Sequence, residues 1–299
     1  MPILASSVGT ELGTCEFEAT PRRVLAYAAG LGMTRGASLD DASPEFAALP
    51  QFCVVAEWPW VSDPARMRAI GLDAREASRA LHVAQDSRFH RPIRPGTRLR
   101  VSGRLAEVRE ARSGTLTTTR IEIVDAGTGA PVTTSWSSAL FRGVALEGEP
   151  RCADARPQAP DGTEPAHEGG EVLLPVAREL GHVYTECSGI WNPIHTERRV
   201  ALAMGLPDII LHGTATWALA GREIVRLFAA GEPDRLQRLA GEFRAVIVPG
   251  SSIRLRHRSR AGPDGGTTVH FTVLNTDGET AVVDGVAELA TAARSRTAT

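Results

Sequence analysis

Alternating apolar and polar positions recur in two separate parts of the chain, and each part has the pattern of short β-strands. Side chains of a strand point in turn to the two faces of its sheet, so each run predicts one buried and one solvated face. β-Branched residues, which favour strands, are frequent in these runs. The predicted strands are 98–102, 117–124 and 132–136 in the first half and 252–257, 267–273 and 281–286 in the second.

A helical period follows Gly213. Apolar residues recur there every three or four positions, as on one face of an α-helix. They are Trp217, Ala220, Ile224, Leu227 and Phe228. Gly213 is therefore predicted at a helix start, where backbone N–H groups lack partners and can hold an anion or an acyl carbonyl. The first half has no such period, because its segment 67–80 is only weakly amphipathic.

The two halves are related by an internal repeat. Five residues of the first half have an identical or similar residue 154 positions later, as Phe89 has Phe243 and Gly96 has Gly250. Tyr27 and Gly32 have the same spacing as Tyr184 and Gly189. The chain is therefore predicted to be two copies of one unit, with the chemistry kept in the second copy only.

A stretch without apolar period separates the copies. It is rich in proline, glycine, alanine and acidic residues, as linkers are. We expect a first repeat at 1–145, a linker at 146–170 and a second repeat at 171–299.

Composition narrows the class of protein. The chain has 299 residues, of which 42% are hydrophobic, and a net charge of −2, so nothing favours a nucleic acid or a membrane surface as partner. The start of the chain lacks the basic flank of a signal peptide, and we expect a cytoplasmic protein. The four cysteines show no metal spacing, and no glycine-rich phosphate loop is visible. We therefore expect free thiols, no metal and no cofactor.

Candidate chemistry lies around His195. Asn192 and Pro193 form a turn that can open a helix, with asparagine at the cap and proline at the first position. His195 would then lie in the first turn. A histidine has an ordinary pKa of about 6.5 and can act as a general base near neutrality. With the amide site of Gly213, it indicates proton transfer beside an acyl carbonyl.

The same residues carry a family resemblance. The segments 188–195, Ser-Gly-Ile-Trp-Asn-Pro-Ile-His, and 210–213, Ile-Leu-His-Gly, resemble the signature of the MaoC-like hydratases and dehydratases, which include the type-2 (R)-specific enoyl-CoA hydratases. The resemblance implies that His195 is the catalytic histidine, that Asn192 positions the reacting groups and that the Gly213 amide forms the oxyanion hole. The family has an aspartate at the position of Ile190. The isoleucine side chain can neither accept nor donate a proton.

The resemblance covers nearly the whole chain. Residues 20–32 resemble the opening of the first half of two-repeat hydratases, 49–55 their next strand, and 81–96 the following segment. The implied fold is an α+β double hot dog, in which each repeat wraps an antiparallel sheet around a long helix. The first repeat, without a catalytic motif, would bind the acyl chain in a widened groove. Substrate-binding residues are then expected at Tyr27, Ile190, Trp191 and His212.

The leading functional hypothesis is a hydratase or dehydratase, a carbon–oxygen lyase, acting on a 2-enoyl or 3-hydroxyacyl thioester with His195 as lone acid–base. A double-bond isomerase or a cyclase would also need only one base, and a non-catalytic acyl-binding homologue is a further alternative. Glu186 can approach the site if its segment is helical, although an exposed position is favoured. The expected partner is an acyl-CoA or acyl-carrier-protein thioester, and both monomer and homodimer are open.

The arginine-rich run 254–260 has two interpretations. Its arginines could contact the phosphates of coenzyme A or of a phosphopantetheine arm. The alternation of side chains slightly favours a solvated strand face.

Overall fold

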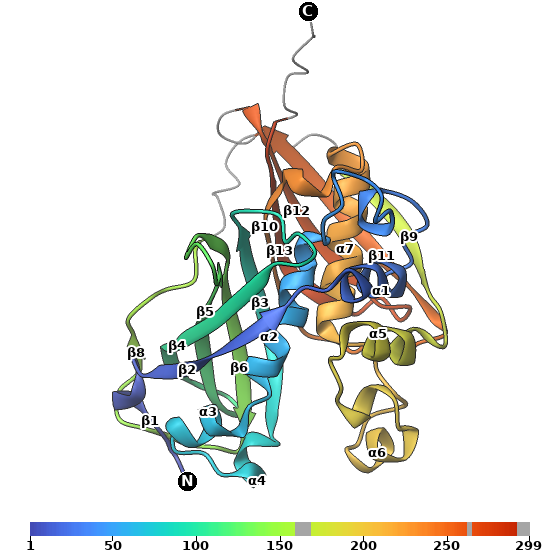
Figure 1. Cartoon of the computed structure of the whole chain (residues 1–299). Helices are drawn as coiled ribbons and strands as arrows, with labels where there is room; N and C mark the ends of the chain where they lie inside the picture. The colour runs from blue at the N-terminus through green and yellow to red at the C-terminus, as the bar shows by residue number, and fades with distance from the viewer. Residues whose placement is uncertain (159–168, 262–264, 292–299) are drawn as a thin grey trace, which may run out of the picture.

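The computed structural model describes residues 1–158, 169–261 and 265–291. Within them, one antiparallel sheet of eleven strands runs through the molecule (Figure 1). Its order is β2-β4-β5-β6-β3-β10-β13-β12-β11-β9, with β8 paired to β4. Along this path, which leaves out β8, each strand of the first half has its counterpart at the mirror position in the second half. The predicted internal repeat is thus confirmed as an approximate twofold relation about the β3–β10 pair.

The strand bounds contain every strand predicted from the alternating pattern. In the first half the strands are β2 (Glu11–Glu18), β3 (Ala80–Phe89), β4 (Arg98–Ala111), β5 (Gly114–Asp125) and β6 (Pro131–Arg142). In the second half they are β9 (Gly170–Val176), β10 (Leu236–Phe243), β11 (Ser251–Ala261), β12 (Thr267–Leu274) and β13 (Thr280–Leu289). A separate parallel pair joins β1 (Ile3–Leu4) to β7 (Leu146–Glu147), and β8 is Arg151–Cys152.

Seven α-helices are defined in the described residues. They are α1 (Pro21–Gly30), α2 (Cys53–Val61), α3 (Pro64–Ala69), α4 (Ala74–Ala77), α5 (Leu180–Ser188), α6 (Arg198–Ala203) and α7 (Gly213–Phe228). Short 3-10 turns are η1 (Ala5–Ser7), η2 (Ala37–Leu39), η3 (Pro50–Phe52), η4 (Pro193–His195) and η5 (Pro233–Arg235). No helix in the described part of the chain is long and apolar enough to cross a bilayer.

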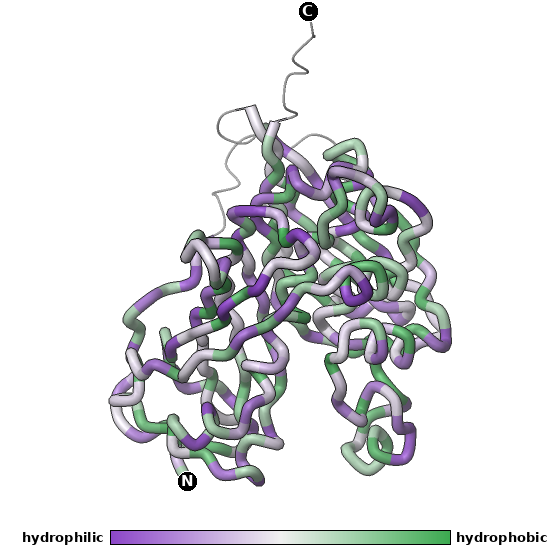
Figure 2. The backbone as a smooth tube through the Cα atoms, in the orientation of Figure 1, coloured by the Kyte–Doolittle hydropathy of each residue, from purple (hydrophilic) through white to green (hydrophobic). Residues whose placement is uncertain are grey.

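Helix α7 begins at Gly213, as its apolar period predicts, and packs against β10, β12 and β13. Its Trp217, Ala220 and Ile224 are fully buried. Figure 2 shows apolar segments gathered where this helix crosses the sheet. The contact removes a broad apolar helix face from water, which is the main driving force for forming the second repeat.

The prediction of a strand at 49–55 is wrong. Pro50–Phe52 form the turn η3, and Cys53 opens helix α2, which packs against β2, β4 and β5 as the central helix of the first repeat. The segment was misread because Cys53, Val54, Val55 and Ala56 are all buried, so the helix shows no polar face. A short continuous apolar run fits a buried strand and a buried helix equally well.

The segment 67–80 contributes only short helical pieces to the first repeat. Helix α3 begins after Asp63, whose carboxylate accepts from the Ala65 N–H at 2.8 Å. Helix α4 begins after Asp73, which forms a capping box with Glu76. These caps account for helices in a segment with a weak apolar period, because side-chain oxygens satisfy the first free amides.

The seam between β3 and β10 contains a buried ion pair. Arg238 donates from Nε to Asp86 Oδ1 at 2.9 Å and from Nη2 to Asp86 Oδ2 at 2.8 Å. The two side chains are 3% and 1% exposed. Arg238 also donates to Glu288 Oε1 at 2.8 Å and to the Pro157 carbonyl at 2.8 Å. Burial lowers the pKa of Arg238, but the hydrogen bonds and charges of Asp86 and Glu288 outweigh this effect and hold the pKa above its ordinary value.

The expected linker, 146–170, falls partly outside the described residues, which omit 159–168. Its beginning is held against the first repeat, since β7 pairs with β1 and β8 with β4. Asp154 accepts from Arg104 Nη2 at 2.8 Å and from Arg120 Nη1 at 3.2 Å. The repeat boundaries themselves stay a prediction.

Removing the seam carboxylate will destabilise the whole chain. Asp86→Ala leaves the Arg238 guanidinium buried with a lost partner, and breaking a buried pair on one side costs about 3–5 kcal/mol. Urea unfolding measures this loss. Arg256→Ala is the control, because its 2.7 Å pair with Glu171 is exposed and worth less than about 1 kcal/mol. A loss for Asp86→Ala no larger than for the control contradicts the prediction.

Candidate active site

The segment between α5 and α6 turns sharply before the motif. Helix α5 ends at Ser188, and Gly189 takes the left-handed conformation with φ 71°, which favours glycine. Asn192 caps η4, its side chain accepting from the Ile194 N–H at 3.3 Å, and Pro193 follows at the first position. The predicted cap and proline are thus confirmed, although the turn is a 3-10 turn rather than an α-helix.

His195 ends this turn in a defined tautomer. Its Nδ1 lies 2.7 Å from the Ile210 carbonyl oxygen. Because a carbonyl only accepts, Nδ1 carries the hydrogen and Nε2 has a free lone pair. Burial lowers the pKa of His195 to about 4, against the opposing effect of the Ile210 bond. His195 is therefore neutral at physiological pH and has the lone pair that a general base needs.

His212 stacks on His195. The ring centroids are 3.6 Å apart and the planes differ by 24°. His212 Nε2 lies 3.0 Å from the Ile190 carbonyl, to which it must donate, and 3.3 Å from Thr185 Oγ1. Burial, and then the proximity of His195, lowers the pKa of His212 to about 3. Two stacked imidazoles cannot both be charged at this distance, so the pair is neutral in the resting protein.

Gly213 follows at the first position of α7. A Cβ at Gly213 would lie 3.1 Å from the Phe243 ring, so the ring approaches the backbone closely there. His212 makes no side-chain cap at this helix start. The first amides of α7 therefore lack an intrahelical partner, at the positive end of the helix dipole. They can hold an oxyanion.

The first repeat lacks this amide site. Leu211 donates to the Ile247 carbonyl at 2.7 Å, and Ala48 donates to the equivalent Ile93 carbonyl at 2.9 Å. Two positions further on, the counterpart of Gly213 is Pro50, which has no N–H. A helix start with proline at this point offers one amide fewer to an anion. This agrees with chemistry confined to the second repeat.

The tertiary structure brings four predicted residues together: His195, His212, the Ile190 backbone and Gly213. The Ile190 side chain is buried, 6% exposed, in the apolar core. Trp191 is 57% exposed and lies at the surface. Asn192 is also exposed.

Tyr27 lies further from the motif. It is fully buried, donates to the Gln51 carbonyl at 3.0 Å and contacts Tyr184 with ring centroids 6.0 Å apart. Tyr184 in turn lies 4.9 Å from the His212 ring. Tyr27 therefore reaches the motif through Tyr184. A role for Tyr27 and Trp191 in acyl binding stays a prediction.

No described carboxylate pairs with His195 or His212. Glu186 is indeed helical, but it faces solvent. The sequence did not indicate that His82 lies near the start of α7, where its ring centroid is 5.1 Å from that of Phe243. No spacing in the sequence could have found it, because its neighbours in space are far away along the chain. Among the described residues, no three His, Cys, Asp or Glu side chains form a group able to hold a metal ion.

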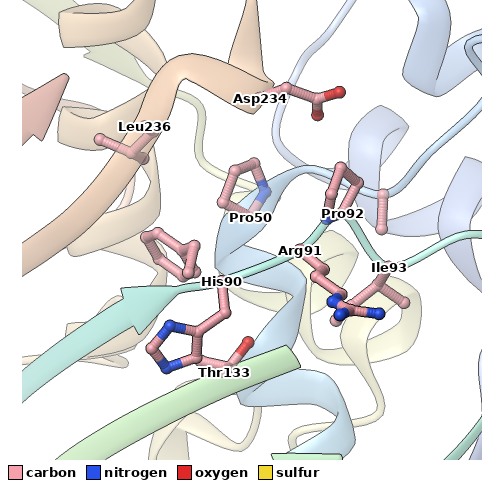
Figure 3. Close-up of a pocket in the computed structure, with 10 residues that line it drawn as sticks. Pro50, His90, Arg91, Pro92, Ile93, Thr133, Asp234 and Leu236 are labelled. Atoms are coloured by element: carbon pink, nitrogen blue, oxygen red, sulfur yellow. The ribbon is translucent and has the colours of Figure 1, made fainter. Parts of the chain in front are cut away.

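Two cavities lie away from the motif. Figure 3 shows one of about 50 Å³, lined by Pro50, His90, Ile93, Asp234 and Leu236 among others. Another, of about 560 Å³, lies over β11, β12 and β13, with Arg256, Arg258 and His270 in its lining. In the run 254–260, Leu255 is buried, Arg256 is exposed and the other residues are less buried than Leu255. This is the pattern of a strand with one solvated face.

Comparison with known proteins completes the description of the site. The model of the MaoC-like domain matches residues 166–281, and that of the N-terminal domain of MFE-2 hydratase 2 matches residues 17–143. Residues 166–281 therefore belong to the family of MaoC-like domains. The two matches fall on the two repeats.

Two relatives that are named as a dehydratase and a hydratase align with most of this chain. The 3-hydroxyacyl-thioester dehydratase Y of Mycobacterium tuberculosis is 26% identical over 85% of the chain and 86% of its own length. Enoyl-CoA hydratase ChsH3 of the same organism is 25% identical over 96% and 98%.

Solved structures of the family show the same fold. A MaoC-like dehydratase from Phytophthora capsici aligns with a TM-score of 0.80 at 21% identity, covering 96% of this chain and 98% of that one. A Mycobacterium tuberculosis protein described as a double hot dog aligns with a TM-score of 0.59 at 15% identity, with 92% of each chain covered. The predicted α+β double hot dog is confirmed.

His195 will titrate far below an ordinary histidine. Because burial disfavours the imidazolium, we expect a pKa of about 4, so the ring stays neutral as pH falls through 6. NMR titration of the histidine ring carbons measures it, with His195→Gln to assign the signal. A His195 midpoint near the usual value of about 6.5 would contradict the buried, neutral stack.

Proposed function

We propose that this MaoC-like protein is a hydratase or dehydratase acting on a 2-enoyl or 3-hydroxyacyl thioester, a carbon–oxygen lyase. The observation that carries the proposal is a neutral His195, with Nε2 free, beside the Gly213 start of helix α7. A base and an amide oxyanion site are the parts that this reaction requires. The names of the relatives agree with it.

In the hydration direction, His195 acts as the lone acid–base. Its Nε2 takes a proton from water while the water oxygen bonds to C3 of the enoyl group. The electron pair of the double bond moves toward the thioester carbonyl, and the Gly213 amide stabilises the resulting oxyanion. The imidazolium then returns a proton to C2. Dehydration is the reverse: His195 removes the C2 proton and protonates the leaving hydroxyl.

The contacts of His195 fix the tautomer and the ring plane that this cycle needs. Its Nδ1–H is fixed on the Ile210 carbonyl, which leaves Nε2 as the only acceptor. His212 restrains the ring plane by stacking and is itself fixed by the Ile190 carbonyl. In this proposal His212 and Ile190 shape the site, and Asn192 positions the water or hydroxyl. An imidazolium formed in the reaction is unstable here, so it returns its proton readily.

The remaining assignments follow from the same proposal. The thioester is carried by coenzyme A or by an acyl carrier protein, and no cofactor or metal takes part. The first repeat accommodates the acyl chain, with Tyr27 and Trp191 at its borders. The protein acts in the cytoplasm. It is a monomer or a homodimer, because one chain already supplies paired repeats.

One observation favours a second candidate. The position of the family aspartate is filled by Ile190, which is buried in the apolar core. A site with one base and no second acceptor for water suits proton movement within an unsaturated acyl thioester, or ring closure by an internal nucleophile. Isomerase or cyclase chemistry would use the same His195 and Gly213.

Mass spectrometry in deuterated water separates these reactions. Purified protein is incubated with a panel of enoyl and 3-hydroxyacyl thioesters, and we expect a mass change by the elements of water. His195→Ala should lower the rate by about 10²–10⁴-fold, the usual contribution of a general acid–base. His257→Ala, a second-repeat histidine packed on Phe228 away from the motif, is the control.

Deuterium uptake without a gain or loss of water would replace the lyase by an isomerase or cyclase. An unchanged panel, or a reaction unaffected by His195→Ala, would leave an acyl-binding homologue.

Restoring the family aspartate tests the cost of its absence. We expect Ile190→Asp to increase hydration by about tenfold or more, because a carboxylate adds a second acceptor for the water. The new negative charge should also raise the pKa of His195. Kinetics and the NMR titration are compared with Ile190→Asn, which is polar but uncharged. Equal rates for both variants and the parent would show that the carboxylate is not the missing element.

A further inference from the structure

His82 comes from the first repeat but lies beside the helix start of the second. It is on β3, and its ring centroid is 5.1 Å from that of Phe243, at an interplanar angle of 69°. The Phe243 ring in turn covers Gly213, as the 3.1 Å approach to a Cβ there shows. One aromatic ring therefore separates His82 from the amide that would hold the thioester oxygen.

His82 belongs to the helix-facing side of its sheet. On β6, Ser135 Oγ donates to Glu57 Oε1 of helix α2 at 2.6 Å, which identifies the face directed at that helix. Ser137 follows two positions later and so shares this face. Its hydroxyl pairs with His82 Nε2 at 3.1 Å. Thr119 of β5 lies directly opposite Ser137 and points the same way.

The second repeat has apolar side chains at the corresponding places. In the first repeat Gln85, Ser137 and Thr119 form one cross-strand row. Through the twofold relation, the matching row on β10, β13 and β12 is Leu239, Ala287 and Val269. These three are fully buried and lie on the half of the sheet that α7 covers. The polar row is thus a difference between the repeats and not a property of the fold.

Part of the polar face is already satisfied from within. Gln85 Nε2 donates to Glu57 Oε2 at 3.2 Å and to Ser87 Oγ at 3.0 Å, and all three side chains are buried. Burial raises the pKa of Glu57 to about 7. These hydrogen bonds satisfy the polar side chains beneath α2, so this part of the face needs no ligand.

The neighbouring residues are accessible instead. Ser137 and Thr119 are half-buried, and the His82 side chain is exposed. His82 also lies against the Phe243 ring, so these accessible polar side chains border the first-repeat side of Phe243.

We propose that His82, Ser137 and Thr119 form a polar subsite for an oxygen atom on the acyl chain. The preferred substrates are then acyl thioesters whose chain carries a hydroxyl or keto group near the thioester. The inference rests on the proposed function, since it assumes a thioester carbonyl at Gly213. It adds a substrate class and a contribution of the first repeat to the site.

The cost of leaving these polar side chains without hydrogen bonds favours a substrate that carries such an oxygen atom. A hydrocarbon chain packed over these polar side chains would remove their water without replacing its hydrogen bonds, at about 1–3 kcal/mol for each group left unpaired. A hydroxyl or keto oxygen would restore a partner. Sites that bind a polar group reject analogues lacking it far more strongly than apolar pockets reject an added hydroxyl.

The test compares 2-enoyl thioesters of equal length, one unsubstituted and the others with a hydroxyl or keto group at successive carbons. We expect the protein to turn over at least one oxygenated thioester with a kcat/KM about tenfold or more above the unsubstituted one. Ser137→Ala with Thr119→Val, and separately His82→Phe, should reduce this preference by about tenfold. His82→Phe keeps a ring against Phe243 and removes both nitrogens.

His90→Phe is the matched control. His90 Nε2 pairs with Thr134 Oγ1 at 3.0 Å, as His82 does with Ser137, but His90 is at the cavity of Figure 3. Its loss should leave the preference unchanged. A wild-type preference for the unsubstituted chain, or an equal loss of both substrates in the His82 and Ser137 variants, would overturn the subsite.

Binding separates this inference from the proposed reaction. Calorimetry of the same thioesters with the His195→Ala protein measures affinity without turnover. If no thioester reacts with the wild type but oxygenated ones bind more tightly, the lyase assignment fails and the subsite stands. Equal affinities for both kinds of chain would refute the subsite, whether or not turnover occurs.

Discussion

The pairing of β3 with β10 is the constraint on which the rest of the molecule depends. It makes one sheet out of two repeats, and its centre holds the bidentate pair of Asp86 and Arg238 away from water. Buried charges tolerate little displacement, because each lost contact leaves a group without hydration or partner. The pair therefore fixes the register of the seam. That register decides which first-repeat side chains face the start of α7.

A second set of contacts, between aromatic rings, supports the motif. Tyr27 of α1 packs on Tyr184 of α5, Tyr184 on His212, and His212 on His195. The two helices are held close, since a Cβ at Gly30 would lie 2.6 Å from Cys187 Cβ. His195 is thus supported by packed rings and one backbone carbonyl. Burial keeps its imidazole neutral, as the proposed role of a general base requires.

The two repeats have diverged by changing a few positions within one framework. At the helix start, proline in the first repeat replaces glycine in the second and removes an amide. On the sheet, Ser137 and Thr119 stand where the second repeat has Ala287 and Val269. The first change leaves the first repeat without the amide that the proposed reaction uses, and the second gives it a polar surface. A duplicated unit with one shared site can divide binding and chemistry in this way.

The sequence by itself determined the strands, helix α7, the repeat, the Asn192 cap and the helix start at Gly213, because periodicity and capping depend on near neighbours along the chain. It did not determine helix α2, whose residues 53–57 are all buried and show no polar face. Nor did it indicate that Trp191 is exposed or that Tyr27 reaches the motif only through Tyr184. The position of His82 was decided by the β3–β10 register alone. Local patterns report how a segment is buried, whereas contacts between distant segments exist only once the sheet has formed.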